Sequence, residues 1–520
     1  MRRLALLAAM IACACLTLWG ADWFTDGHDA QRTGWQNEEK ILTTANVKDI
    51  KLLWKMKTES VPPAGVTGGF GIGRNLFPPL VASKVNTSTG QKEIVLLGTA
   101  YDYLYAIDAN SGSVVWSKHF DNGGITGNCQ GLHMTTPVIG PRSRPGDYTV
   151  YAVSFDGKMH QLDLADGKEV SPAEQFIPSN TSAHALVLQD GVVYTMTGDN
   201  CGSHANYIYG FEAETDRTFT FSPGSGAMWG SRGPAIGADG TIYAGTGDGQ
   251  YDPANGLYGD SIVGAKPNAS TGILELAKYY APSNTEFMYK RDLDINVTPT
   301  IFKYKGKEYL ADSSKECRVW LLDTANFGGK NHQTPVYRTP QICNEFTNYF
   351  SVGVWGAISS WVDPSGTPWV VVPFWGAQHS QFKAAIEYGP VTKGAVAAFK
   401  IEERSGELRL TPAWVSHDLG APGPPVIANG IVFAYRAGAD TTITRDDLPV
   451  GQAPNAPSRL AASTYSILYA LDGQTGKELW SSGDQITSFN HQSGLTVANG
   501  KVYIGTYDGT EYCFGFSKDN

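Results

Sequence analysis

The sequence predicts an all-β protein, specifically an eight-bladed β-propeller of four-stranded antiparallel blades. Its composition is one reason: 59 glycines, 11 % aromatic residues and only 17 % charged residues are typical of many short strands joined by tight turns. A second reason is a short pattern that recurs about eight times along the chain, and a third is that most copies are far enough apart for one four-stranded blade.

The recurring pattern is a strand that ends in an acid, with a glycine four residues later. Two copies have the full form Ala-x-Asp-x-x-[Ser/Thr]-Gly-x-x-x-Trp, and they end at Trp116 and Trp480. We expect these tryptophans and the pattern glycines to pack one blade on the next, which is a structural role without chemistry. Weaker copies lie at Asp163, Glu212, Thr271–Gly272, Asp323, Glu402 and Tyr512–Phe514. The first five copies are roughly 49–56 residues apart and the later gaps are about 79, 70 and 42 residues.

The N-terminus has the features of an export signal over residues 1–21, with two arginines, an apolar stretch and then Gly20 and Ala21. The apolar stretch is too short to cross a bilayer comfortably. We expect cleavage near Gly20 or Ala21 and a periplasmic or secreted product with no transmembrane segment in the mature chain. Two early cysteines keep lipoprotein processing open. Residues 22–520 then form a single propeller domain.

Residues 46–54 come before the first copy of the pattern and have no blade of their own. We expect them to supply the outer strand that closes the ring against the last blade, which removes an exposed sheet edge. The two wide gaps between copies predict loop insertions around residues 335–365 and 437–462.

Charge and cysteine content exclude some classes of function. The formal net charge is −10 and there is no basic run, which argues against nucleic acid as a partner. There is no Cys-x-x-Cys pair, so the sequence encodes neither a zinc ribbon nor a covalently attached haem. Cys317 and Cys343 are a candidate disulfide pair, since export permits such a bond.

Residues 225–325 contain most of the candidate site residues. Trp229 precedes a predicted strand that ends in Gly-Thr-Gly before Asp248, and Lys315 lies shortly before another strand. Between them, alternation along an extended segment places Asp292 and Asp294 on the same side. Two carboxylates so placed repel each other unless a cation or a shared proton lies between them.

In this order and spacing, these residues resemble the pyrroloquinoline quinone (PQQ)-dependent alcohol dehydrogenases, whose tryptophan-docking signature the repeat also resembles. By its period, the resemblance covers nearly all of residues 22–518. It implies a dehydrogenase that oxidises an alcohol or polyol with PQQ and a bound Ca²⁺, or a lanthanide as in members with a second aspartate. Since no haem motif is present, electrons would pass to a separate acceptor such as a cytochrome.

The resemblance also assigns roles to individual residues. Asp292 would be the catalytic base, Lys315 the basic group that faces the quinone oxygens, and Trp229 the floor under the quinone ring. Ser154 and Ser182 match hydroxyl donors to the quinone. The metal ligands would be Asp248, Asp292, Asp294 and Asn200, with Asp199 as the alternative to Asn200.

The sequence departs from the family pattern in three places. Cys129 stands alone where the family has two adjacent cysteines, and the arginine expected a few residues later is absent. Residues 197–202 occupy the neighbourhood of the glutamate that completes the metal site in the family.

A second interpretation stays open, that of a cofactor-free propeller acting as a binding or assembly scaffold. Asp248 would then be a turn residue, Asp292 and Asp294 a solvated acidic loop, and Lys315 an ordinary lysine at a strand end. Trp355, in a stretch rich in glycine and aromatic residues, fits either core packing or the lining of a central funnel.

Overall fold

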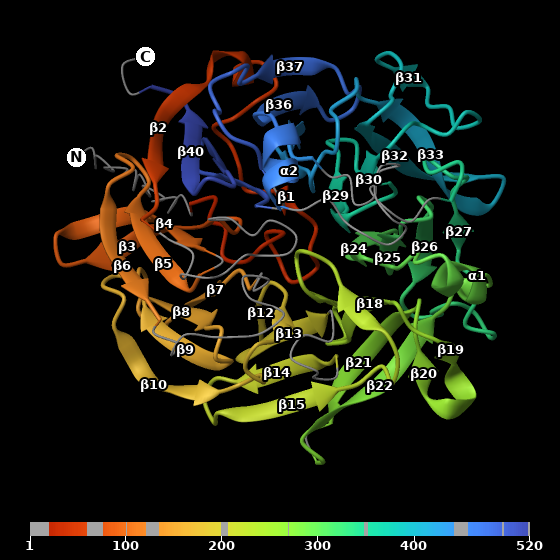
Figure 1. Ribbon diagram of the computed structural model, residues 1–520, viewed down its shortest axis with the longest axis horizontal. Helices are drawn as coiled ribbons and strands as arrows, with labels where there is room; N and C mark the ends of the chain where they lie inside the picture. The colour runs from red at the N-terminus through yellow and green to blue at the C-terminus, as the bar shows by residue number, and fades with distance from the viewer. Residues whose placement is uncertain are drawn as a thin grey trace, which may run out of the picture.

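The structure, a computed structural model, describes residues 20–59, 76–99, 101–120, 135–198, 206–268, 270–347, 352–440, 456–490 and 493–517. These residues form eight sheets arranged in a ring around a central axis (Figure 1). Within each sheet, the long strands are antiparallel neighbours in chain order. The predicted eight-bladed β-propeller is therefore confirmed, with a short fifth strand added to four of the blades.

The first four blades run in order around the ring. Blade 1 contains β3 (Leu80–Thr87), β4 (Gly90–Gly98), β5 (Tyr103–Asp108) and β6 (Val114–His119). Blade 2 contains β7 (Val138–Pro141), β8 (Tyr148–Val153), β9 (Lys158–Asp163) and β10 (Glu169–Gln175). Blade 3 contains β11 (Ser182–Ala183), β12 (Val187–Gln189), β13 (Val192–Gly198), β14 (Ile208–Glu212) and β15 (Arg217–Phe221). Blade 4 contains β16 (Ala227–Trp229), β17 (Ala235–Ile236), β18 (Ile242–Gly247), β21 (Ile262–Asn268) and β22 (Ile273–Tyr280).

The other four blades complete the circle. Blade 5 contains β24 (Thr300–Tyr304), β25 (Lys307–Ser313), β26 (Val319–Asp323) and β27 (Tyr337–Arg338). Blade 6 contains β29 (Ser359–Val362), β30 (Pro368–Trp375), β31 (Ile386–Glu387), β32 (Gly394–Arg404) and β33 (Glu407–Val415). Blade 7 contains β1 (Trp35–Gln36), β34 (Val426–Ala428), β35 (Ile431–Arg436), β36 (Ile467–Asp472) and β37 (Glu478–Ser481). Blade 8 contains β2 (Lys51–Lys57), β38 (Leu495–Ala498), β39 (Lys501–Gly505) and β40 (Thr510–Gly515).

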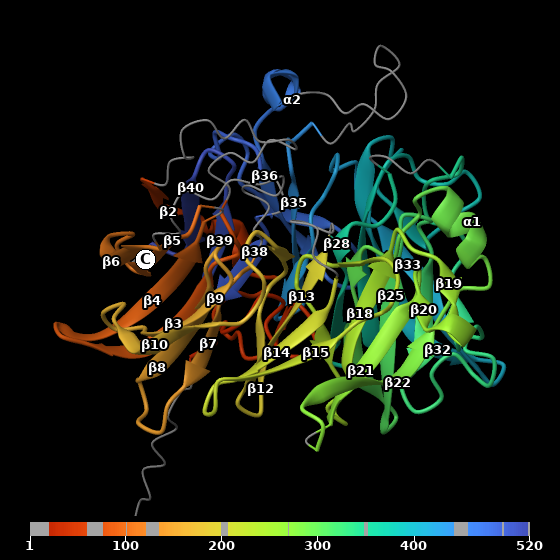
Figure 2. The same ribbon diagram turned by 60° about the horizontal axis from the view of Figure 1, so that its bottom comes forward.

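The remaining elements are short. The helical ones are η1 (Val47–Asp49), η3 (Pro253–Asn255), α1 (Thr285–Lys290) and α2 (Ala456–Ala462), and two small sheets pair β19 (Tyr251–Asp252) with β20 (Leu257–Tyr258) and β23 (Val297–Thr298) with β28 (Gly356–Ala357). Helix α2 lies in the predicted insertion at residues 437–462, whereas the loop at residues 376–393, between β30 and β32, was not predicted. Both α1 and α2 lie on one side of the ring (Figure 2), which we call the upper face. No helix in the described part of the chain is long and apolar enough to cross a membrane.

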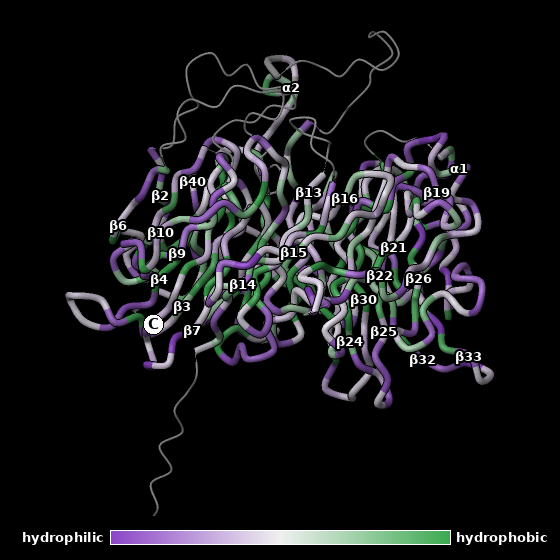
Figure 3. Tube along the Cα trace, turned by 90° about the horizontal axis from the view of Figure 1, so that it is seen from below, coloured by the Kyte–Doolittle hydropathy of each residue, from purple (hydrophilic) through white to green (hydrophobic). Residues whose placement is uncertain are grey.

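The middle strands of the blades are buried on both faces, because every blade is packed between two others. All eight residues of β30 are buried, for example, and its sequence is almost entirely apolar. Hydrophobic residues therefore follow the strands inside the ring and hydrophilic residues follow the turns (Figure 3).

Tryptophans on outer strands pack on glycines of the next blade, as the repeat predicts. The Trp116 indole donates a hydrogen bond to the Leu164 carbonyl at 2.8 Å and covers Gly167, where an added Cβ would lie 2.7 Å from the ring. Trp414 covers Gly476 in the same way. Trp480 instead meets the Phe514 ring of the last blade, with the two ring centres 5.5 Å apart.

The ring is closed by β2, which pairs antiparallel with β40 of the last blade. This confirms the prediction for residues 46–54. Trp54 of β2 then covers Gly112 of blade 1 and donates a hydrogen bond to the Ala109 carbonyl. The contact between outer tryptophan and glycine therefore continues across the point where the two ends of the ring meet.

Residues 21–36, which we call the axial segment, pass through the middle of the ring (Figure 1). The segment makes a hydrogen bond to every blade, in or beside its inner strand. In ring order these bonds join Trp23 to Val81, Phe24 to Ile139, Thr25 to Leu186, Ala30 to Ile236, Gln31 to Ile301, Thr33 to Ser360, Gly34 to Ile427 and Ala21 to Asn499.

Three buried charged side chains fix the axial segment. Arg32 is fully buried and donates hydrogen bonds to the carbonyls of Leu186 and Pro234, in blades 3 and 4. Arg232 of blade 4 and Asp26 of the segment are also buried, with 3.7 Å between guanidinium and carboxylate. Buried charges of this kind are stable only when they are paired and hydrogen-bonded.

Cys317 and Cys343 form a disulfide with 5.5 Å between their Cα atoms. This confirms the predicted pair. The bond ties the turn after β25 to the insertion that follows blade 5.

Candidate functional site

The turns between the second and third long strands of the blades gather on the upper face, because all eight blades are the same antiparallel meander around one axis. Asp248 directly follows β18, and Lys315 follows β25 by two residues. Asp292 and Asp294 arrive by another route, on the segment that leads from α1 to β23. The fold thus brings together three segments that are far apart in the sequence.

Asp248, Asp292, Asp294 and Lys315 form what we call the aspartate–lysine cluster. The Lys315 ammonium donates a hydrogen bond to Asp292 Oδ1 at 2.6 Å and is also paired with Asp294 Oδ2. Asp294 Oδ1 accepts the backbone N–H of Asp248 at 3.0 Å. One carboxylate oxygen from each aspartate lies within 4.8 Å of the other two. The arrangement is that of a small cation site in which a lysine already supplies one positive charge.

Burial within the cluster changes along its depth. Asp294 and Lys315 are 2 % and 6 % exposed, whereas the Asp292 side chain is 34 % exposed and Asp248 lies open at the rim. Both Asp248 and Asp292 have left-handed backbone, with φ of 56° and 53°, a conformation that aspartate tolerates better than most residues. The cluster therefore has a dry base and a wet mouth.

The proximity of the acids shifts their pKa values. Loss of hydration and then contact with Asp294 raise the pKa of Asp292 to about 8. The same two causes raise the pKa of Asp248 to about 6, although Asp248 is the most exposed of the three acids. Burial lowers the pKa of Lys315, but attraction by Asp294 and Asp292 outweighs it, so that the net shift is upward. Lys315 is therefore a permanent cation in this site.

A fourth acid, Asp260, lies near the cluster and was missed in the sequence. It is fully buried, and neither of its carboxylate oxygens has a hydrogen-bond partner among the described residues. Burial and then the charges of Asp294 and Asp248 raise its pKa to about 9. Asp260 lies outside the repeat pattern, two residues after β20 and two before β21, so no local signal marked it.

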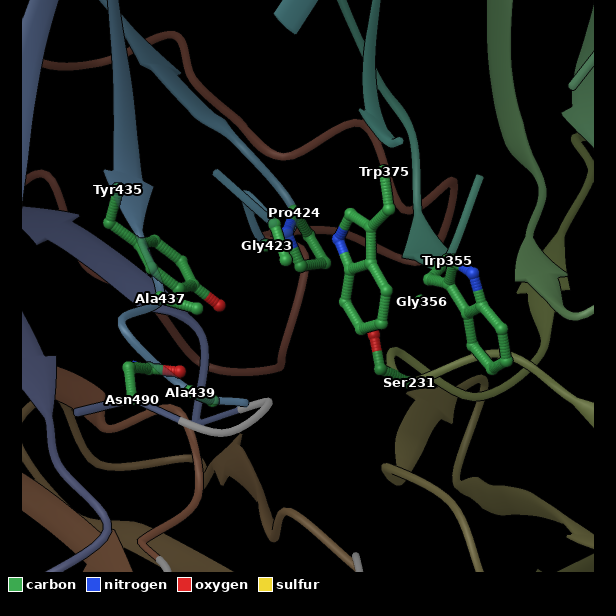
Figure 4. A pocket seen from close by; sticks show the side chains of 11 residues that line it. Ser231, Trp355, Gly356, Trp375, Gly423, Pro424, Tyr435, Ala437, Ala439 and Asn490 are labelled. Carbon is green, nitrogen blue, oxygen red and sulfur yellow. The ribbon is translucent and has the colours of Figure 1, made fainter. Parts of the chain in front are cut away.

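An aromatic wall adjoins the cluster. The Lys315 ammonium lies 5.1 Å from the centre of the Trp355 ring, within the range of a cation–π contact. Trp355 stacks on Trp375, with ring centres 5.2 Å apart and planes 15° from parallel. Both indoles line a pocket whose other residues come from blades 4, 7 and 8, including Ser231, Tyr435 and Asn490. Such a combination of blades meets only around the axis, and Figure 4 shows Tyr435 and Asn490 across the pocket from Trp355.

Trp229 ends β16, two residues before Ser231 of this pocket. The Trp229 indole is half-buried, and its N–H has no hydrogen-bond partner among the described residues. Gly230 has a φ of 134°, and a Cβ there would lie 2.4 Å from Thr298 Oγ1. Only glycine fits at this position, which brings the chain from Trp229 into the pocket lining.

The other predicted site residues lie elsewhere or are not described. Ser154 is buried in blade 2 and contacts Asp156 and His160, and Ser182 pairs with Gly198 in blade 3. Asn200, together with Asp199 and Cys129, lies outside the described residues. Among the predicted residues, the structure thus brings Asp248, Asp292, Asp294 and Lys315 together, whereas Trp229 is two residues along the chain from Ser231 of the axial pocket and is not part of its lining.

The donor set of the cluster suits a hard cation. Carboxylate oxygens are the ligands that Ca²⁺ and similar ions take in proteins. Two of these acids have raised pKa values, and a cation bound between them would lower those values. The two unpartnered oxygens of Asp260 add a further acid to the same region, one that becomes charged when a cation binds close by. On these observations, the residues fit a bound metal ion.

Comparison with known proteins places the fold. A family model described as "Outer membrane protein assembly factor BamB" matches residues 28–220, and no curated protein matches the chain in sequence. A europium-containing methanol dehydrogenase shares the fold with a TM-score of 0.61 and 12 % identity, over 95 % of this chain and 98 % of that one.

Two other similar structures are quinohemoprotein alcohol dehydrogenases. The enzyme from Comamonas testosteroni has a TM-score of 0.58 and 16 % identity, over 96 % of this chain and 81 % of that one. ADHIIG from Pseudomonas putida HK5 has a TM-score of 0.59 and 14 % identity over the same shares. Likeness at such low identity shows a common fold.

Proposed function

We propose that this chain, which has the eight-bladed fold of the PQQ-dependent alcohol dehydrogenases, is a periplasmic or secreted quinoprotein dehydrogenase. It would oxidise an alcohol or polyol with PQQ and a bound metal ion, and pass the electrons to a separate acceptor such as a cytochrome. The observation that carries this proposal is the meeting of three aspartates and a lysine beside the aromatic wall of the axial pocket. A ring with a purely structural role does not need this concentration of charge.

Asp248, Asp292 and Asp294 would hold the metal ion, with Asn200 as a further ligand. Their oxygens lie within 4.8 Å of one another, and Ca²⁺ takes six to eight oxygen ligands at about 2.3–2.6 Å. A bound ion would lower the raised pKa of Asp260 close by, and this fourth acid, once ionised, would favour an ion of higher charge, such as a lanthanide.

The aromatic residues of the site would hold the quinone. Trp229 offers a half-buried indole, and Trp355 and Trp375 offer a stacked pair that lines the axial pocket. Flat ring systems bind well between such surfaces. Ser154 and Ser182 remain our proposals for residues that donate hydroxyl hydrogen bonds to the edge of the quinone. When bound, PQQ would supply the hydride acceptor and the metal ion would act as a Lewis acid.

Asp292 would take the proton of the alcohol hydroxyl group. Its side chain is 34 % exposed, so a substrate can reach it from the upper face. The Lys315 ammonium, 2.6 Å away, and the bound metal ion would together offset the raised pKa of Asp292 and favour the carboxylate form that accepts the proton. Lys315 would also stabilise negative charge on the reduced cofactor, as a fixed cation in a dry site does.

Cofactor retention tests the proposal. We expect the protein incubated with PQQ and Ca²⁺, or with PQQ and a lanthanide, to keep the quinone absorbance through gel filtration and to lose it when an alcohol is added. Asp292→Ala and Lys315→Ala should lose retention. Asp239→Ala is the matched control, because Asp239 also pairs with lysines in blade 4 but lies on its surface. If no metal gave retention, the dehydrogenase proposal would be wrong.

The alternative is a cofactor-free binding or assembly scaffold. One observation favours it: the Lys315 charge is already balanced by Asp292 and Asp294 in the protein alone, so the cluster can be stable without a ligand. The match of residues 28–220 to an assembly-factor family model points in the same direction. Failure of retention with every metal would leave this function.

A further inference from the structure

Three side chains of blade 2 form a hydrogen-bonded series, of which the proposed function uses only Ser154, as a hydroxyl donor to the quinone. Ser154 Oγ lies 2.9 Å from His160 Nε2, and His160 Nδ1 lies 2.9 Å from Glu169 Oε1. Ser154 follows β8, His160 lies on β9 and Glu169 begins β10. The series therefore crosses three neighbouring strands of one blade, from the inside of the ring toward its outer edge.

The inner end of this series is at the level of the axial site. Ser154 is the first residue after the second strand of blade 2, as Asp248 is in blade 4 and Ala437 is in blade 7. Asp248 belongs to the aspartate–lysine cluster, and Ala437 lines the axial pocket. By the repeat of the ring, Ser154 occupies the equivalent position in blade 2, two blades from Asp248.

The outer end of the series reaches water. Ser154 is 1 % exposed and His160 is covered by the Phe120 ring, whose centre is 4.0 Å from its own. The Glu169 side chain is 33 % exposed, and it also accepts a hydrogen bond from the Lys118 ammonium at 2.9 Å. The hydrogen-bonded series thus joins the buried Ser154 to the solvent-exposed Glu169 through His160, which Phe120 shields from solvent.

The hydrogen bonds allow two arrangements of protons. With His160 neutral, the Ser154 hydroxyl donates to Nε2 while Nδ1–H donates to Glu169. With His160 charged, both ring N–H groups donate, and the Ser154 hydroxyl must turn to another acceptor. Asp156 Oδ1, 2.5 Å from Ser154 Oγ, is that acceptor. A serine with two alternative acceptors can take up one proton and give up another without leaving its place.

Alcohol oxidation releases protons that a hydrogen-bonded series of side chains could carry. Each turnover converts RCH₂OH into RCHO, two electrons and two protons. On the proposed function, the electrons go to a one-electron acceptor, and the protons must leave a partly buried site for water. We propose that Ser154, His160 and Glu169 are positioning residues of that reaction, and that they conduct protons from the axial site to the outer rim of blade 2.

The charges around His160 suit this role. Burial lowers the pKa of His160, whereas Glu169 and Asp156 raise it and Lys118 lowers it. The net direction is downward, so the ring is neutral at neutral pH and able to accept a proton. A histidine that held its proton permanently would block the series.

Proton release during reoxidation tests the relay. The holoprotein is reduced with alcohol without air and mixed with ferricyanide, while quinone absorbance and a pH indicator are followed together. In the wild type, we expect protons to appear as fast as the quinone returns. In His160→Gln, PQQ retention should be unchanged but proton appearance should lag at least tenfold, and added imidazole should restore it in His160→Gly. Equal rates in His160→Gln would overturn the relay.

A measurement without cofactor separates the relay from a structural role. Exchange of the His160 ring carbon hydrogen, followed by mass spectrometry against pH, reports the pKa of His160. We expect a pKa below the ordinary 6.5, and a lower one still in Glu169→Gln. A pKa above 6.5 would contradict the relay.

His119→Gln is the matched control, since His119 also stacks on an aromatic ring, that of Tyr103, in the neighbouring blade. It should behave as the wild type in both measurements, and a lag there would overturn the relay. Loss of PQQ retention in the wild type would instead disprove the proposed function, on which the relay rests.

Discussion

Asp294 and Lys315 are both almost completely buried, and each is the nearest opposite charge of the other. Removing one partner of such a pair leaves an uncompensated charge in a dry site, which costs far more than the net value of the pair itself. Stability and function are therefore linked at these two residues.

Asp294→Asn should lower the free energy of unfolding by about 2–4 kcal/mol. The reason is that Lys315 would then be paired only with Asp292, at the exposed end of the cluster. Urea unfolding of this variant, of Lys315→Met and of the double variant measures the effect. We expect the double variant to be less destabilised than the sum of the two single ones, and simple additivity would contradict the pairing.

His184 makes stability depend on pH. Its Nε2–H donates to the Met228 carbonyl, and its Nδ1 is buried without a partner among the described residues. Burial lowers the pKa of His184 to about 4 from 6.5. The unfolded chain thus takes up the proton first, so stability is complete above pH 6.5 and falls as pH drops from about 6.5 to about 4.

The free energy of unfolding should fall by about 3 kcal/mol between pH 6.5 and pH 4, at about 1.36 kcal/mol for each unit by which the pKa of His184 is lowered. Urea unfolding midpoints of the wild type and of His184→Gln, measured between pH 7 and pH 4, test this prediction. The difference between the two should shrink as the pH falls. A constant difference would mean that His184 titrates normally in the folded protein.

Single residues were predictable where a local pattern marked them. Asp292, Asp294 and Lys315 could be found because their order and spacing resemble a known family. The two aspartates do lie together, but not by alternation along an extended segment, since Asp292 lies in a turn with left-handed backbone. Asp260 and the partners of Ser154 could not be found, since burial and contact between strands depend on the whole ring. His160 and Glu169 carry no motif, and only the register of β9 and β10 joins them.

At the scale of the elements, the blades depend on close contact between a tryptophan and a glycine. Gly112 has a φ of +71°, and an added Cβ would lie 2.8 Å from the Trp54 ring. Gly272, in a weaker copy of the same turn, has the same φ of +71° but nothing within 4 Å. The two positions therefore share their backbone conformation and differ in their packing.

Gly272→Ala should lower the free energy of unfolding by about 1–2 kcal/mol, because alanine must adopt left-handed backbone there. Gly112→Ala should cost at least about 2 kcal/mol more, because Trp54 must also move. Thermal or urea unfolding of both variants gives the comparison. Equal losses would show that the docking of Trp54 on blade 1 contributes nothing to ring closure.

The strands themselves were largely predictable, because the sequence pattern of one blade recurs about eight times. The closing strand followed from one segment without a blade, and β2 confirms it. The loop at residues 376–393 and the hairpin of β19 and β20 were not predicted. Both interrupt a blade between its second and third strands, where the repeat imposes no sequence.

At the scale of the whole molecule, the axial segment is hydrogen-bonded to every blade. Arg32→Met should remove hydrogen bonds to blades 3 and 4 together and destabilise the protein by about 3–5 kcal/mol. Hydrogen exchange of the inner strands should then accelerate in all eight blades. Arg404→Met, at an exposed arginine of blade 6, is the control and should leave exchange unchanged. Acceleration confined to blades 3 and 4 would contradict a common tie.

The axial segment also occupies the middle of the ring, where it is hydrogen-bonded to every blade. On the proposed function, we expect the alcohol, the aldehyde and the electron acceptor to reach the site from the upper face, where the aspartate–lysine cluster lies, through one entrance. The alcohol and the electron acceptor would then bind one after the other, and the steady-state rate would follow a double-displacement (ping-pong) mechanism. Plots of reciprocal rate against reciprocal alcohol concentration, at several acceptor concentrations, should be parallel lines, whereas intersecting lines would mean that both reactants bind at once.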